Sequence, residues 1–381
     1  MGQATKGGGM NTFSLNRVRC VVGATAARNL KIIFANYQMT GGSGEVSVGN
    51  AFTLQAAIEC SAVFGTSTPQ ELTFGGASSV TVGDLAVVTS DVITESFPAG
   101  TVVYLRMLIT VAAGKFWPLG QAIGANQQAG RQGTDNAAAL TQLMTAGSLP
   151  AVNATFLTQS GIYPPASVIG LTAAPQVSCA FAGDSIADGS SDVTGDGTGG
   201  MGGGTTGGGF ILRGLGALNI PSAKLARGSE LLRDFANPAL SPLRRARLSS
   251  ATHFLSELGS NDITGGRTLA QMQADYLTAW GYGNAAGCHV AQTLILPRTD
   301  AAGTTPVSGF GVGELRDQIN DWIVAQVGQG VLDEAIDINS AVEGVGNTWL
   351  SNMTSDGTHP IQAGHEAITT VFQAAADAWE A

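Results

Sequence analysis

The residues of this chain best suited to chemistry form three short blocks in its C-terminal half. The first is Gly183-Asp184-Ser185, which follows the apolar run 177–181. A serine at the end of a buried strand, beside a glycine that lets the backbone turn, is where an α/β protein presents a nucleophile. Because a serine hydroxyl alone is unreactive at neutral pH, it needs a base, an orienting carboxylate and donors for an oxyanion.

The second block is Gly259-Ser260-Asn261-Asp262, at the end of another apolar run. The side-chain amide of Asn261 can donate a hydrogen bond to a developing oxyanion. The alternative interpretation is an ordinary polar turn, for which this composition is also typical.

The third block, 355–360, contains Asp356 and His359 three positions apart and opens the last predicted helix. One turn of chain can present both side chains to the same place, so Asp356 either orients His359 or caps the helix. His359 precedes a proline in a polar turn and is the expected base, with His365 as a second candidate. His253 and His289 lie at strand starts, where we expect partly buried side chains.

These blocks, in this order, resemble the SGNH (GDSL-type) hydrolase family over residues 176–381. The resemblance implies a serine carboxyl-ester hydrolase with Ser185 as nucleophile, His359 as base and Asp356 as the carboxylate. It also implies an oxyanion hole made by the N–H groups of Ser185 and Gly228 and the amide of Asn261. The first block reads Gly-Asp-Ser-Ile in place of the family's literal Gly-Asp-Ser-Leu, an exchange of apolar residues that a buried position accepts.

After residue 176 apolar strands alternate with helix-like segments, which is typical of a parallel sheet with crossover helices. The predicted fold is a three-layer, flavodoxin-like α/β domain with five parallel strands. The predicted strands are 177–181, 223–225, 253–258, 290–296 and 335–338, and the predicted helices are 210–218, 238–248, 268–280, 313–327 and 361–379.

The N-terminal half instead shows short alternating runs separated by glycine-rich turns, which predict an all-β sandwich, jelly-roll-like. The predicted strands are 17–22, 30–37, 52–58, 80–82, 85–88, 102–110 and 167–171, with a short helix over 136–145. The expected organisation is a flexible leader (1–15), a β-sandwich accessory domain (16–175) that could bind carbohydrate, and the SGNH hydrolase catalytic domain (176–381).

Composition excludes several classes of function. The 381-residue chain has a net charge of −10, which argues against a nucleic-acid partner because phosphate binding needs clustered Lys and Arg. The basic cluster 244–247 is interpreted as a solvated helix face. Four cysteines without metal-ligand spacing indicate neither a zinc site nor a disulfide framework, although Cys20 and Cys60 could pair. We expect no metal and no cofactor.

No apolar run reaches the roughly 18 residues that a membrane span needs, so we expect no membrane span. The N-terminal residues lack the apolar core of a secretory signal, and the sequence leaves compartment and oligomeric state open. The segment 195–209 has ten glycines in fifteen residues and is expected to be a mobile loop near the site. A phosphate cradle is disfavoured there because no Lys-Ser/Thr pair follows.

The expected substrate is a small-molecule or glycan acyl ester, with a short acyl group, acetyl in particular, cleaved through an acyl-enzyme. An acetylated carbohydrate is favoured by analogy with family members that carry an added β-sandwich. Two alternatives stay open. One is a broad-specificity short-chain esterase or lipase-like enzyme, and the other is a non-catalytic glycan-binding or virion structural protein with a relic hydrolase domain.

Overall fold

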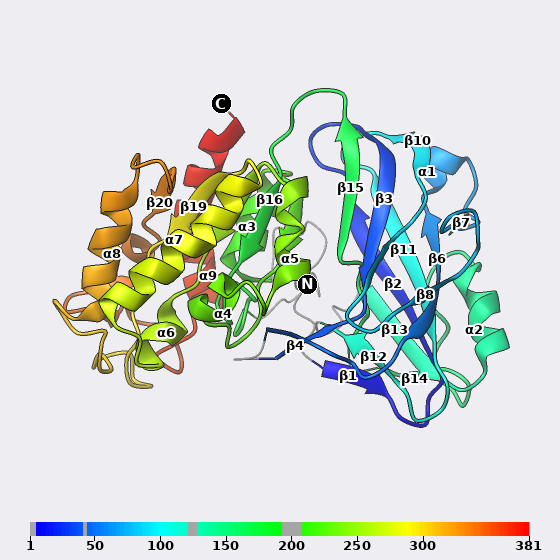
Figure 1. The fold of residues 1–381 in the computed structure, drawn as a ribbon, viewed down its shortest axis with the longest axis horizontal. Helices are drawn as coiled ribbons and strands as arrows, with labels where there is room; N and C mark the ends of the chain where they lie inside the picture. The colour runs from blue at the N-terminus through cyan, green and yellow to red at the C-terminus, as the bar shows by residue number, and fades with distance from the viewer. Residues whose placement is uncertain (1–4, 41–43, 121–127, 160, 193–207, 381) are drawn as a thin grey trace. The chain divides into compact units, whose positions relative to one another are not determined.

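The computed structural model describes residues 5–40, 44–120, 128–159, 161–192 and 208–380. It divides into two compact units (Figure 1). One takes residues 5–40 and 45–176, and the other takes Gly44 and the described residues from Val177 onward. Each unit is described by itself below. The predicted loop 195–209 lies almost wholly outside the described residues.

The N-terminal unit is built from antiparallel sheets, which confirms the prediction of an all-β half. One sheet has the strand order β14-β13-β2-β11-β6-β7 with β8 also on β6, and another has the order β10-β3-β15 with β9 also on β3. The strands up to residue 176 are β1 Thr5–Gly8, β2 Phe13–Val21, β3 Ala27–Ala35, β4 Gln38–Thr40, β5 Gly44–Val46, β6 Phe52–Glu59, β7 Gln70–Leu72, β8 Val80–Val82, β9 Val87–Thr89, β10 Ile93–Phe97, β11 Val102–Thr110, β12 Phe116–Leu119, β13 Gln128–Gly133, β14 Leu157–Thr158 and β15 Ser167–Thr172. The helices there are α1 Ser61–Phe64 and α2 Asn136–Leu143.

A single apolar cluster joins the two larger sheets of this unit. Phe34 of β3 and Phe52 of β6 both pack against the ring of Tyr163, with centroid distances of 6.5 and 5.6 Å. All three side chains are buried within the same cluster. Burial of such aromatic side chains is the main stabilising term in a unit of this kind.

The chain start differs from the expected leader over 1–15. Residues Thr5–Gly8 form β1, which pairs antiparallel with β12, and β2 begins at Phe13. The side chains of Phe13 and Leu15 are fully buried. Glycine-rich composition indicated flexibility, but backbone pairing with a distant strand orders these residues, and such pairing leaves no local sequence signal.

The C-terminal unit is a five-stranded parallel sheet with the order β17-β16-β18-β19-β20, which confirms the predicted α/β fold. The strands are β16 Cys179–Ala182, β17 Ser222–Lys224, β18 His253–Ser256, β19 His289–Thr293 and β20 Glu334–Ile336, with a small hairpin of β21 Glu343–Gly344 and β22 Thr348–Trp349. The α-helices are α3 Gly209–Ala217, α4 Leu232–Ala236, α5 Pro242–Arg245, α6 Ser260–Thr264, α7 Leu269–Ala285, α8 Leu315–Gln326 and α9 Gln362–Asp377.

Alternating residues of the central strands build a core on each face of this sheet. In β16, Cys179 and Phe181 pack in the cluster that includes α3 and α9, whereas Ala180 and Ala182 pack in the cluster that includes α4, α7 and α8. Figure 1 shows α7 and α8 on one side of the strands and α9 on the other. Buried strands of this kind read as continuous apolar runs, which is why the sequence revealed them.

Two local predictions are wrong in this unit. The helix expected over 238–248 is only the short α5, because Pro242 occupies the first turn and starts a new helix there. The basic cluster 244–247 is not a solvated face. Arg244 is 1% exposed and makes two hydrogen bonds to the carboxylate of Glu230, at 2.7 and 3.1 Å. Arg245 donates to the carbonyls of Phe235, Asn237 and Pro238.

Candidate active site

The structure brings Ser185, His359 and Asp356 into one hydrogen-bonded line. The Oγ of Ser185 lies 2.8 Å from Nε2 of His359. The Nδ1 of His359 lies 2.7 Å from Oδ2 of Asp356. Ser185 follows β16 at the carboxyl end of the sheet, and the other two side chains come from the loop before α9. The line has the connectivity of a serine nucleophile, a base and an orienting carboxylate.

The loop that carries His359 is fixed by hydrogen bonds from its backbone N–H groups to the Asp356 side chain. Oδ1 of Asp356 accepts the N–H groups of Thr358 and His359, both at 2.8 Å. Gly357 has φ of +76°, and a Cβ there would collide with the carbonyl oxygen of Asp300. The N-cap residue of α9 is Ile361, so Asp356 does not cap that helix. Asp356 therefore has one oxygen for the backbone and one for the imidazole.

Asp356 is held in its ionised form. Partial burial acts to raise the pKa of this carboxyl, but the hydrogen bonds from the side chain and backbone of His359 and from the Thr358 N–H outweigh it and lower the pKa to about 2. At neutral pH the carboxylate is an acceptor only, so it selects the imidazole tautomer with a proton on Nδ1. That tautomer leaves Nε2 free to accept a proton from Ser185.

His365, the second candidate for the base, is not in this line. Its Nε2 lies 3.0 Å from the carbonyl oxygen of Ser190, and its ring stacks against Phe210. Burial lowers the pKa of His365, which keeps the ring neutral in its pocket. Its contacts are those of a buried structural histidine.

Two backbone N–H groups beside Ser185 are free to receive an oxyanion. Gly228 lies close to the nucleophile, since a Cβ built on it would be 3.9 Å from Cβ of Ser185. Within the described residues, neither the Ser185 N–H nor the Gly228 N–H donates to an acceptor. The loop of Gly228 is tied to the nucleophile strand by the hydrogen bond from Arg227 N to Gly183 O, at 3.0 Å.

Asn261 lies next to Asp184, the residue before the nucleophile, but its side-chain amide already donates two hydrogen bonds. Its Nδ2 donates to Oδ2 of Asp184 and to the carbonyl of Glu230, each at 3.1 Å. Its Oδ1 accepts a hydrogen bond of 3.3 Å from Arg298. These three contacts fix which way the amide faces. To hold an oxyanion, Nδ2 must give up or share one of its two bonds.

Sequence reasoning missed Glu257 and Arg298 and gave Asp184 no role. Glu257 and Asp184 are buried carboxyls at the ends of β18 and β16, and Arg298 follows β19. Asp184 lies inside the first block and Glu257 two residues before the second, so two acids at neighbouring strand ends were the available signal. Arg298 has no signal of its own in the sequence.

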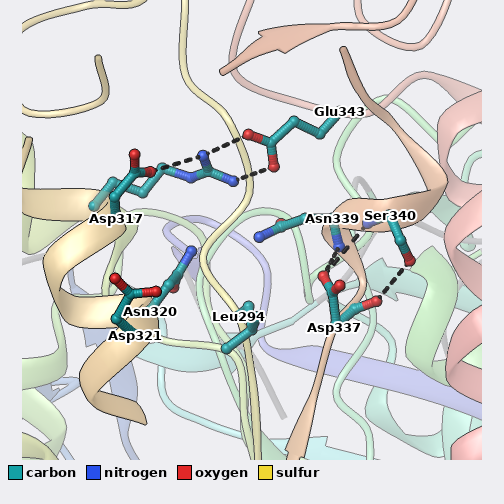
Figure 2. Close-up of a pocket in the computed structure, with 9 residues that line it drawn as sticks. Leu294, Asp317, Asn320, Asp321, Asp337, Asn339, Ser340 and Glu343 are labelled. Carbon is teal, nitrogen blue, oxygen red and sulfur yellow. Dashed lines mark hydrogen bonds and ion pairs between the residues drawn. The ribbon is translucent and has the colours of Figure 1, made fainter. Parts of the chain in front are cut away.

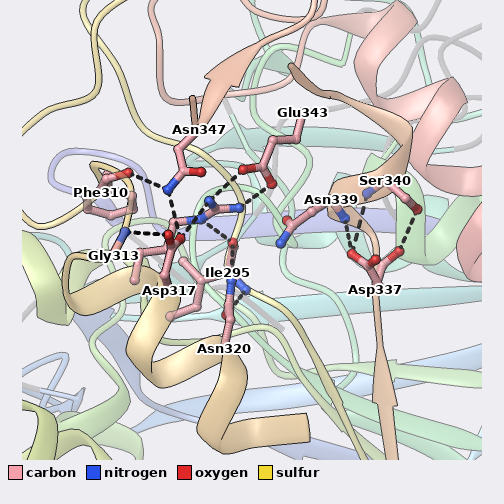
Figure 3. A network of polar contacts seen from close by, with 11 residues as sticks. Ile295, Phe310, Gly313, Asp317, Asn320, Asp337, Asn339, Ser340, Glu343 and Asn347 are labelled. Carbon is pink, nitrogen blue, oxygen red and sulfur yellow. Dashed lines mark hydrogen bonds and ion pairs between the residues drawn. The ribbon is translucent and has the colours of Figure 1, made fainter. Parts of the chain in front are cut away.

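A pocket of about 380 Å³ lies elsewhere in this unit, between α8 and the segment after β20 (Figure 2). It contains no member of the Ser185 line. Its wall is held by Arg316, which makes two hydrogen bonds to the carboxylate of Glu343, at 2.8 and 2.6 Å. Figure 3 shows this network continuing through Asp317 to Asn347, whose amide is 2.7 Å from the Asp317 carboxylate.

The described residues show neither a metal site nor a membrane-spanning helix. No cluster of three or more His, Cys, Asp or Glu side chains there has the arrangement of a metal site. No helix in those ranges has the length and apolar character needed to cross a membrane.

The cysteines of the described ranges carry no disulfide. Cys20, Cys60, Cys179 and Cys288 are all free thiols. Burial raises the pKa of Cys20 to about 12 and also raises that of Cys288, so both thiols stay protonated at neutral pH.

Comparison with solved structures finds distant matches. A psychrotrophic esterase from Pseudoalteromonas sp. matches at 15% identity with a TM-score of 0.39, covering 53% of this chain and 97% of that one. An acetyl-xylooligosaccharide esterase from Geobacillus Stearmophilus matches at 16% identity with a TM-score of 0.38, covering 51% of this chain and 92% of that one. A Bacillus subtilis protein matches at 13% identity with a TM-score of 0.38, covering 96% of this chain and 77% of that one.

No curated protein sequence matches the chain. Residues 181–367, which hold all three sequence blocks, match the profile of the GDSL-like lipase/acylhydrolase family. The C-terminal unit of this chain thus belongs to the GDSL-like lipase/acylhydrolase (SGNH) family of carboxylic ester hydrolases.

Proposed function

We propose that this protein hydrolyses short acyl esters, acetyl esters in particular, through an acyl-enzyme on Ser185. The observation that carries the proposal is the line from Asp356 through His359 to Ser185, with contacts of 2.7 and 2.8 Å. A serine without such a base is unreactive at neutral pH.

In the proposed reaction, Nε2 of His359 takes the Oγ proton as Ser185 attacks the ester carbonyl carbon. The oxyanion of the tetrahedral intermediate accepts hydrogen bonds from the Ser185 and Gly228 N–H groups, joined by Nδ2 of Asn261. His359 then gives its proton to the leaving alkoxide, and the alcohol departs. A water molecule, deprotonated by His359, attacks the acyl-enzyme and releases the acid.

The surroundings of Ser185 favour a polar alcohol, and we propose a carbohydrate. Asp188 lies beside Gly228, since the Cβ position of that glycine is 3.8 Å from Oδ2 of Asp188. The guanidinium of Arg298 lies at hydrogen-bond distance from Asn261 and Thr264. Hydroxyl groups of a sugar match such hydrogen-bonding side chains better than an alkyl chain does.

We further propose that residues 16–175 act as an accessory domain that presents the substrate to the catalytic domain of 176–381. Within the described residues of the N-terminal unit, no Trp, Tyr or Phe is exposed. Sugar binding there would therefore depend on polar side chains instead of aromatic stacking. Retention of the full-length S185A protein on insoluble acetylated xylan or peptidoglycan tests this role, and a protein that elutes freely from both contradicts it.

The central test compares Ser185→Ala with Ser190→Ala, which removes a hydroxyl five residues along the same turn. We expect S185A to fold normally, to lose turnover of p-nitrophenyl acetate, and to escape labelling by a fluorophosphonate. S190A should keep both properties. A wild-type protein that folds but takes no label on Ser185 would instead support the non-catalytic binding or virion structural alternative.

Substrate preference is tested with a p-nitrophenyl ester series and with acetylated xylan. Acetyl release from the glycan, with kcat/KM falling steeply beyond short acyl chains, supports the proposal. Equal rates along the series and no release from the glycan support a broad-specificity esterase. For the oxyanion role, Asn261→Ala is expected to lower kcat by about two to three orders of magnitude, the usual effect of losing one oxyanion donor.

A further inference from the structure

Two buried carboxyl groups lie in contact directly behind the nucleophile. Asp184 and Glu257 are 1% and 5% exposed, at the ends of the adjacent strands β16 and β18. Their side chains hydrogen-bond each other. Gly183 makes the approach possible, since a Cβ on it would lie 2.7 Å from Oε2 of Glu257.

This pair holds the turn on which Ser185 sits. Oε2 of Glu257 accepts the Asp184 N–H at 3.0 Å, and the same carboxyl accepts the Ala187 N–H. Oδ1 of Asp184 accepts the Ile186 N–H at 2.9 Å. The backbone on both sides of Ser185 is thus fixed by the two carboxyls, and with it the direction of the Ser185 N–H.

The same pair also fixes Asn261. Oδ2 of Asp184 accepts one of the two hydrogen bonds that the Asn261 amide donates. Through Asp184, Glu257 is therefore connected to two donors of the proposed oxyanion hole, the Ser185 N–H and the Asn261 amide. Glu257 itself touches neither the imidazole of His359 nor the Oγ of Ser185.

Two carboxylates in hydrogen-bond contact inside a protein cannot both be ionised at low cost, so the pair holds one proton. Burial raises the pKa of both groups, and that of Glu257 lies far above its ordinary range. His359 and Arg298 face Asp184 and favour its charged form. Tyr276 of α7 also borders the pair, and Asp262 of α6 lies near Tyr276. Glu257 is therefore the neutral member and Asp184 the carboxylate.

We propose that Glu257 is a positioning residue for ester hydrolysis, which as a neutral acid donates a hydrogen bond to Asp184 and so keeps the Ser185 turn and the Asn261 amide aligned for the oxyanion. The inference rests on the function proposed above. When Glu257 loses its proton, two negative charges face each other behind the oxyanion hole. The alignment is then lost, and the added charge disfavours the oxyanion.

Three variants test this role. In Glu257→Gln the amide nitrogen can donate to Asp184 while the amide oxygen accepts the backbone N–H groups, and nothing titrates. In Glu257→Leu the volume stays similar but the hydrogen bonds are lost. The matched control is Glu343→Gln, which changes another Glu that has buried bonding partners but shares no hydrogen bond with Ser185, His359 or Asp356.

The expected kinetic result is a change in kcat with little change in KM, because the pair does not contact the substrate. We expect kcat of E257L to fall about 100-fold, the usual effect of misplacing a catalytic group by an ångström. E257Q should stay within a few-fold of wild type at pH 7. Wild type and E343Q should lose kcat at alkaline pH as Glu257 ionises, and E257Q should not. An alkaline fall in E257Q equal to that of wild type, or a folded E257L with normal kcat, overturns the proposal.

An infrared measurement keeps the proposal testable if E257L fails to fold. At pH 7.5 the wild-type protein and S185A should both show the C=O stretch of a neutral buried carboxylic acid, and E257Q should lack it. Retention of the band in E257Q, or its absence from the wild type, refutes the neutral Glu257. The band reports on the carboxyl pair and does not need turnover. Absent esterase activity with the expected band would count against the proposed function alone.

Discussion

Replacing Asp356 with asparagine is expected to stop the reaction by trapping His359 in the wrong tautomer. Oδ1 of Asp356 accepts two backbone N–H groups at 2.8 Å, so the amide oxygen of an asparagine must take that place. Its NH2 group then faces Nδ1 of His359, which lies 2.7 Å from Oδ2 in the wild type. Nδ1 becomes an acceptor, and the imidazole proton moves to Nε2. Protonated Nε2 cannot take the proton of Ser185.

The size of the effect follows from the same geometry. In a serine triad, a carboxylate-to-amide change that traps the wrong tautomer lowers kcat about 10⁴-fold, which corresponds to about 5.5 kcal/mol of transition-state stabilisation. Asp356→Ala should cost less. The Asp356 side chain is 47% exposed, so water can enter in its place and leave the imidazole free to adopt either tautomer.

The assay is steady-state hydrolysis of p-nitrophenyl acetate by wild type, D356N and D356A, with circular dichroism to confirm folding. Nitrogen-15 NMR of His359 should find the proton on Nδ1 in the wild type and on Nε2 in D356N. If kcat of D356N stays within tenfold of wild type, or exceeds that of D356A, the tautomer argument is wrong.

Three further predictions concern stability, measured by urea denaturation. Gly357→Ala should lower the free energy of unfolding by at least about 2 kcal/mol and impair turnover, because the new Cβ meets backbone atoms at positive φ. The control is Gly346→Ala, where φ is +77° and the new Cβ meets no atom. This variant should lose less stability and keep its kcat. Arg244→Met leaves the Glu230 carboxylate, which is 3% exposed, without its cationic partner. We therefore expect the free energy of unfolding to fall by about 3–5 kcal/mol, and a fall below about 1 kcal/mol would contradict a stabilising ion pair. Burial raises the pKa of Asp262 from 3.8 to about 6, so its stabilising contribution is complete below pH 3.8 and is lost as pH rises through 6. Wild type should therefore lose about 2 kcal/mol relative to D262N between pH 4 and 7, and parallel pH curves for the two proteins would refute this.

The sequence indicated the C-terminal fold well because its signals there are local. The runs that became β16, β18 and β19 are buried on both faces and read as continuous apolar stretches. The positions of Ser185, Asp356 and His359 also follow from short blocks at strand and helix ends, which a single pass along the chain detects.

The features that the sequence did not indicate depend on contacts with residues far along the chain, or lie in segments whose local composition is typical of another structure. Arg244 lies in a run of basic residues that is typical of a solvated helix face, and only the folded chain places Glu230 against it. The first strand, β1, pairs with β12 more than 100 residues away, so its glycines read as a flexible leader. Register between distant strands has no counterpart in local composition.

The carboxyl pair illustrates how the sheet itself creates a functional arrangement. The parallel ladder of β16 and β18 pairs Ala182 with Ser256, and its next bond runs from Glu257 N to Ala182 O at 2.9 Å. The chains then diverge, and the following N–H, that of Asp184, finds the Glu257 side chain in place of a backbone carbonyl. A carboxyl at this position therefore continues the strand pairing for one more hydrogen bond.

The hydrogen bond from Asp184 N–H to Glu257 lies at the topological switch point of the sheet, because β17 pairs with β16 on one side and β18 pairs with it on the other. In open α/β sheets such a position is where ligands bind. The segments that follow the three strands carry Gly228, Ser185 and Asn261, the last of them in the short helix α6, so the proposed oxyanion donors meet at the end of β16. A glutamine at 257 could make the same hydrogen bonds, but only an acid can lose a proton. The difference between E257Q and wild type at alkaline pH therefore separates what the hydrogen bonds contribute from what the charge contributes.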